Sequence, residues 1–116
     1  MTTRRKAIRF AGVPLFAALA PAAKLPNDTL AAEKAKLTKE PFGDLRIYFD
    51  GATDQIRSMT AGSLLLKPGM TPHAPHQHPE EEFMVITEGN GEISLDGKIT
   101  KVAPGSMMYC AAGVRD

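Results

Sequence analysis

Short apolar runs alternate with turn residues from Pro41 onward, whereas the chain before Pro41 lacks this pattern. The runs have the length of β-strands and contain the β-branched and aromatic residues that strands favour. Asp50-Gly51 and Asp96-Gly97 lie between runs, and Asp-Gly is typical of tight turns. With no convincing helix among the runs, the pattern predicts a small all-β sandwich or barrel. The expected strands are Leu45–Phe49, Ser58–Lys67, Glu82–Thr87, Gly91–Leu95, Ile99–Val102 and Ser106–Cys110.

Two segments depart from this alternation. Phe83–Ile86 is apolar at every position, which predicts a strand buried on both faces. Residues 23–44 are rich in Lys, Ala and Pro, and we expect them to form a lead-in arm or linker. Within them, Ala31–Lys39 fits either a short helix capped by Asn27 or Asp28 or a part of the linker.

The first 22 residues have the three parts of an export signal. A basic start is followed by an apolar stretch from Ala11 to Ala20 and by the small residues of Ala20-Pro21-Ala22, after which we expect cleavage. The apolar stretch is short for a membrane span, so we expect no stable membrane anchor after cleavage. Thr3–Arg9, with Arg4 and Arg5, resembles a twin-arginine signal, which implies a bacterial periplasmic or extracellular protein. A general secretory signal or a basic amphipathic tail is the alternative.

Length and charge narrow the class of protein. A chain of 116 residues holds at most one small globular domain, and its single cysteine, Cys110, excludes an internal disulfide. In its apolar surroundings Cys110 is expected to be a small buried hydrophobe. The formal charge is +1, but beyond residue 22 there are ten basic and 13 acidic residues, a balance of −3. This balance argues against nucleic-acid binding.

Metal-binding chemistry is concentrated in residues 73–82, which hold all three histidines and three consecutive glutamates. In an extended chain His76 and His78 point to the same side, and Glu82 shares their parity. Two imidazoles and one carboxylate are typical of a divalent transition-metal site with open positions. We therefore predict His76, His78 and Glu82 as metal ligands. The alternative is a solvated polar loop spaced by prolines.

The neighbouring polar residues have less defined roles. Glu80 shares the parity of Glu82, so a bend at Pro79 would exchange the two, whereas Glu81 is expected to be a surface charge. His73 has the opposite parity to His76 and is interpreted as an entrance residue or a surface histidine.

The same run resembles the first motif of the cupin superfamily. The matching residues are Gly69, His76-Gln77-His78, Glu82 and Gly89, with six residues rather than five between Gly69 and His76. The second cupin motif is matched more weakly. Gly105 and Gly113 fit it, whereas Ala111 replaces its proline and Asp116 stands where the family has a fourth ligand, a histidine. Asp116 either ligates in its place or does not, and both possibilities stay open.

The cupin resemblance covers residues 45–116 and implies a small double-stranded β-helix, or jelly-roll barrel, that lacks its closing C-terminal strands. It further implies a divalent transition metal (Fe, Mn, Ni, Zn or Cu) and a small organic ligand or substrate, with dioxygenase- or isomerase-type chemistry. A non-catalytic binding module and a truncated inactive cupin are the alternatives. An exposed strand edge in such a barrel invites pairing with a second chain, so a homodimer is expected.

Overall fold

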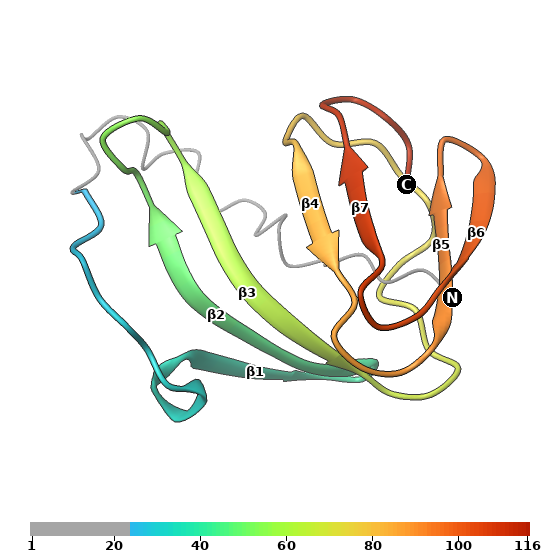
Figure 1. The fold of residues 1–116 in the computed structure, drawn as a ribbon, viewed down its shortest axis with the longest axis horizontal. Coiled ribbons are helices and arrows are strands. Elements are labelled where there is room, and N and C mark those ends of the chain that lie inside the picture. The colour runs from blue at the N-terminus through green and yellow to red at the C-terminus, as the bar shows by residue number, and fades with distance from the viewer. Residues whose placement is uncertain (1–23) are drawn as a thin grey trace. The chain divides into compact units, whose positions relative to one another are not determined.

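The computed structural model describes residues 24–116, so the export signal predicted for residues 1–22 lies outside the described residues (Figure 1). The described chain is all-β, with antiparallel strands in small sheets, which confirms the predicted fold class. None of its helices is long and apolar enough to cross a membrane. Its elements are a 3₁₀ turn η3 (Ala32–Lys34) and the strands β1 (Lys36–Glu40), β2 (Gly43–Gly51), β3 (Met59–Leu66), β4 (Glu82–Val85), β5 (Gly91–Leu95), β6 (Lys98–Val102) and β7 (Met107–Cys110).

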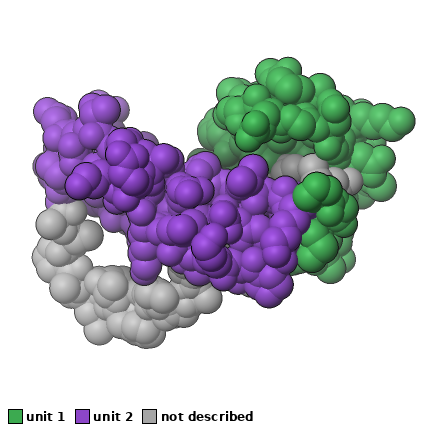
Figure 2. All heavy atoms as spheres, turned by 90° about the horizontal axis from the view of Figure 1, so that it is seen from below, with its two compact units in different colours: residues 1–6, 68–116 green, residues 7–67 purple. Residues whose placement is uncertain are grey.

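The described residues divide into two compact units, 24–67 and 68–116, coloured purple and green in Figure 2. The first unit is a three-stranded antiparallel sheet in the order β1-β2-β3. A bulge between Ile47 and Phe49 interrupts the pairing of β2 with β3. Gly43 begins β2 where the Leu65 carbonyl of β3 approaches so closely that a Cβ would collide with it.

Residues 31–39, which the sequence left open between a helix and a linker, form η3 and most of β1. The stretch expected to be a lead-in arm therefore contains a strand. β1 is an edge strand whose residues are largely exposed, and its sequence contains Lys and Thr rather than an apolar run. The hydrophobic pattern therefore did not indicate a strand here. Its pairing with β2 depends on backbone hydrogen bonds rather than on a buried face.

The second unit contains two antiparallel pairs, β4 with β7 and β5 with β6. The β5–β6 hairpin turns at Asp96-Gly97, as the sequence predicts, and both residues have the positive φ that such a turn requires. The core lies between the two pairs. It is made of the buried residues Ile93, Met108 and Cys110, with Met84, Ile86, Leu95, Val102 and Val114 packed against them. Cys110 is thus a buried small hydrophobe, as expected.

The prediction that Phe83–Ile86 is buried on both faces is wrong. Met84 and Ile86 pack against the core, but Phe83 is 68% exposed and Val85 50% exposed. The reason is that β4 belongs to a two-stranded sheet with a single covered face, so alternate residues point away from the core. Their partners on β7, Tyr109 and Met107, are exposed with them. An apolar strip therefore runs along the outer face of β4 and β7.

Candidate metal centre

The candidate site lies where two segments of the second unit meet at one end of the β4–β7 pair. Glu82 at the start of β4 is paired with Cys110 at the end of β7. The loop that leads into β4 and the segment that follows β7 therefore lie beside each other, because antiparallel partners share an end of their sheet. The loop contains His76 and His78, and the segment ends at Asp116.

Backbone hydrogen bonds extend this pairing to the site itself. His76 N–H donates to Asp116 O, and Asp116 N–H donates to His76 O, both at 2.9 Å. Gly113 N–H donates to His78 O at 2.8 Å. Residues that exchange both hydrogen bonds in an antiparallel pair point their side chains to the same side of the pair. Asp116 is thereby placed next to the histidines.

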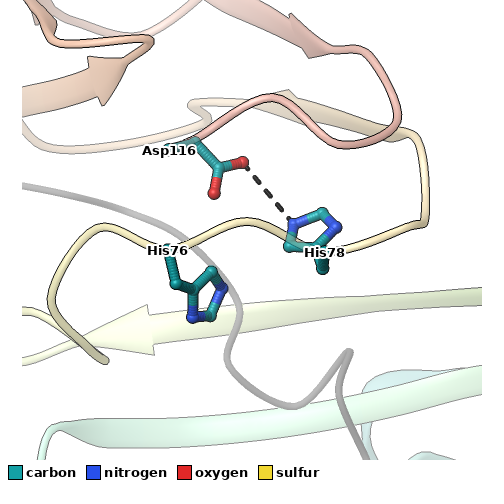
Figure 3. A group of neighbouring side chains, drawn as sticks. All are labelled: His76, His78 and Asp116. Carbon is teal, nitrogen blue, oxygen red and sulfur yellow. Dashed lines mark ion pairs between the residues drawn. The ribbon is translucent and has the colours of Figure 1, made fainter.

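Three side chains from these segments converge to the spacing of a metal site (Figure 3). One ligand atom from each of His76, His78 and Asp116 lies within 4.8 Å of the others. Asp116 Oδ2 lies 3.6 Å from His78 Nε2. Glu82 Oε1 lies at the same distance, 3.6 Å, from this nitrogen. The structure therefore brings His76 and His78 together with Asp116, and it places Glu82 beside His78.

The site is buried, although it consists of ionisable groups. The side chains of His78, Glu82 and Asp116 are 3%, 0% and 0% exposed. Charged carboxylates are costly to bury unless positive charge or hydrogen-bond donors compensate them. Imidazole nitrogens and carboxylate oxygens grouped in this way match the donors that divalent transition metals accept. The residues present thus fit a metal ion, although their role as ligands stays a prediction.

A hydrogen bond sets the orientation and the tautomer of His78. Its Nδ1 lies 3.0 Å from Glu80 O. Because a carbonyl oxygen only accepts, Nδ1 carries a proton, and Nε2 is the ring nitrogen that faces Glu82 and Asp116. Metal-binding histidines are commonly held in this way, by a bond from the second ring nitrogen to a carbonyl or carboxylate.

The other acidic and histidine residues of the loop lie around this group. Glu80 is exposed, and its Oε1 is 3.4 Å from Nδ1 of His78, on the opposite side of the ring from Glu82. Glu82, rather than Glu80, therefore faces Nε2. Glu81 is exposed, as expected, and accepts a 2.8 Å hydrogen bond from the Tyr109 hydroxyl. This bond to the carboxylate raises the pKa of Tyr109, because it favours the protonated phenol.

His73 packs against the site rather than standing apart from it. Its ring is stacked on that of His76, with centroids 3.9 Å apart and planes 14° from parallel. The parity argument separated the two histidines, but it holds only for a straight strand, and prolines interrupt this loop. His73 is half-buried, which is compatible with the predicted entrance position.

Asp116 is the site residue that the sequence left open. The signal that pointed to it was its alignment with the histidine of the second cupin motif. Parity within the loop could not place it, since it lies 40 positions beyond His76 in the sequence.

No curated protein and no solved structure matches the chain. One family model does, that of the Cupin domain, and the matched segment begins in β3 and ends one residue before Asp116. It includes the loop with His76, His78 and Glu82 and all strands of the second unit. Residues 62–115, just under half of the chain, thus match the Cupin domain, and this match supports placing the chain in the cupin superfamily.

Proposed function

We propose that this protein is a cupin-like metal-binding protein that acts on a small organic molecule. The observation that carries the proposal is the convergence of His76, His78 and Asp116, from two distant segments, to within 4.8 Å. With Glu82, whose Oε1 lies 3.6 Å from His78 Nε2, the ligands would be two imidazoles and two carboxylates. Such a set suits Fe, Mn, Ni, Zn or Cu as a divalent ion.

The bound metal would supply a Lewis acid with positions left for a ligand. The protein's residues would hold this centre in a fixed arrangement. The Glu80 carbonyl keeps Nε2 of His78 directed at the carboxylates, and the backbone bonds between His76 and Asp116 fix the second segment. Burial of Glu82 and Asp116 strengthens their electrostatic interaction with a cation. The cupin resemblance favours dioxygenase- or isomerase-type chemistry on the small molecule.

A non-catalytic binding module is the second candidate. It is favoured by Asp116, which stands where the cupin motif has a histidine, so the donor set is not the one that the catalytic resemblance implies. An inactive cupin belongs to the same class, as a protein that binds without turnover.

Export and self-association are further parts of the proposal. The basic, apolar and small-residue parts of residues 1–22 support export to the periplasm or beyond by the twin-arginine route. The exposed apolar strip of Phe83, Val85, Met107 and Tyr109 supports a homodimer, because a second copy would remove this surface from water. The net negative charge beyond residue 22 argues against nucleic acid as a partner.

Metal analysis of untagged protein tests the shared premise. We expect about one equivalent of a transition metal after reconstitution, and less than about 0.1 equivalent would overturn the proposal. The variant H76A/H78A should lose the metal, whereas E81Q, which removes a carboxylate bonded to Tyr109 and outside the site, should retain it. Oxygen uptake with phenols and diketones then separates a dioxygenase from a binding module.

A further inference from the structure

The charge of the donor set differs from that of the cupin motif that it resembles. His76 and His78 would each be neutral imidazoles when they bind a metal, and the Nδ1 atom of His78 then donates to the Glu80 carbonyl. Glu82 and Asp116 each contribute one negative charge as carboxylate ligands. Together they cancel the charge of a divalent ion, whereas a histidine at position 116 would leave one positive charge on the centre.

The groups around the site also affect how strongly its charge acts on a ligand. The Glu80 carboxylate lies 3.4 Å from Nδ1 of His78, but it is exposed, so water weakens the negative potential that it adds behind the ring. Glu82 and Asp116 are fully buried, so water screens their charges little. An anion that approached a metal at this site would therefore gain no net electrostatic attraction from the charge of the centre.

We propose that this centre selects a neutral or cationic ligand, and that Asp116 is the residue that determines this specificity. The inference rests on the proposed function, since it requires a divalent metal held by these residues. The organic molecule would coordinate through an uncharged donor, such as an amine, an alcohol or a carbonyl oxygen. Carboxylates and other anions would bind more weakly than neutral ligands of similar size.

Ligand titrations of the Co(II)-loaded protein test the proposal, with visible absorption as the readout and azide and imidazole as the anionic and neutral probes. Metal analysis comes first, because a protein that takes up no Co(II) contradicts the proposed function rather than this inference. In the loaded wild-type protein we expect imidazole to bind at least about tenfold more tightly than azide. Azide binding as tight as or tighter than imidazole binding would overturn the inference.

Two variants attribute the preference to Asp116. D116N removes the charge at nearly constant shape, and D116H installs the histidine of the cupin motif. In each loaded variant the affinity for azide should rise by about tenfold while that for imidazole changes by less than about threefold. D96N is the matched control, because it makes the same change in net charge at an exposed turn whose positive φ suits asparagine. Unchanged azide affinity in the loaded variants, or an equal rise in D96N, would contradict the role of Asp116.

Discussion

His76 and Asp116 exchange both of their backbone hydrogen bonds, at 2.9 Å each, although they are 40 positions apart in the sequence. This pairing continues, beyond the strands, the antiparallel arrangement of β4 and β7, in which Glu82 is paired with Cys110. The position of the Asp116 carboxylate beside the histidines is therefore set by the backbone. Such preorganisation lowers the conformational entropy that a ligand must remove when it binds.

Replacement of His78 should weaken metal binding far more than replacement of His73. His78 directs Nε2 at both buried carboxylates, whereas the His73 ring stacks on that of His76 and its Nδ1 lies 2.7 Å from Ala74 O. We expect H78A to lower the affinity for Zn(II) by more than about 100-fold and H73A by less than about tenfold, measured by competition with a chromophoric chelator.

Far-ultraviolet circular dichroism of both variants controls for folding. The hypothesis of a His78-centred site fails if folded H78A retains the wild-type affinity, or if H73A loses as much affinity as H78A.

The strands and turns whose formation depends on residues close in the sequence could be predicted from the sequence. The expected strands agree with β2 to β7 to within two residues at each end, because turn dipeptides such as Asp96-Gly97 mark where strands stop. Local sequence signals could not predict β1, whose exposed polar residues depend on pairing with β2. Nor could they show that Phe83 and Val85 are exposed, since an apolar residue does not reveal whether its face is covered.

The residues of the candidate site also differ in how far the sequence could predict their positions. The closeness of His76 and His78 in the sequence led to the prediction that they lie together, and the structure places both in one group of possible metal ligands with Glu82 beside His78. The position of Asp116 depends on a long-range backbone pairing, which only the resemblance to a second motif suggested.

The hydrogen bond between Tyr109 and Glu81 should appear in the alkaline titration of the protein. The carboxylate raises the pKa of Tyr109 above its ordinary value of 10.0. In a Y48F background, which leaves Tyr109 as the one tyrosine, E81Q should return this pKa toward 10.0, as measured by tyrosinate absorbance.

The same shift fixes the sign of a stability effect. The folded protein holds the phenol proton more tightly than the unfolded chain does, so the contribution is fully present below pH 10 and is lost as the pH rises through the raised pKa. Denaturant unfolding of Y48F and Y48F/E81Q should therefore converge at high pH. An identical titration of Tyr109 with and without Glu81 would contradict the assignment.

Cys110 should support the segment that carries Asp116. Its Sγ lies 3.6 Å from both Ala111 O and Val114 O, and the residue is 1% exposed. C110A removes a buried thiol from the core and should lower the free energy of unfolding by about 1–2 kcal/mol. Because the turn at 111–114 precedes Asp116, the affinity for Zn(II) should also fall, by about three- to tenfold.

S106A is the control for C110A, since it removes a hydroxyl that bonds to Ala103 N in an exposed turn before β7. It should leave metal affinity unchanged. In the wild-type protein, a thiol-reactive aromatic disulfide should label Cys110 only as fast as the structure opens, so rapid labelling of the folded protein would contradict its burial.

The apolar strip on the outer face of β4 and β7 should control self-association. Val85 is paired with Met107 and lies two positions after Phe83, on the same face of β4, and all three side chains are exposed. V85K places a charge within this strip, where a dimer would have to bury it without a partner, so the dimer should dissociate at least about 100-fold more readily in sedimentation equilibrium. I99K is the matched control, because Ile99 is 64% exposed on β6 in the other sheet of the same unit. A wild-type protein that sediments as a stable monomer, or a V85K variant that dimerises as well as I99K, would contradict an interface on this face.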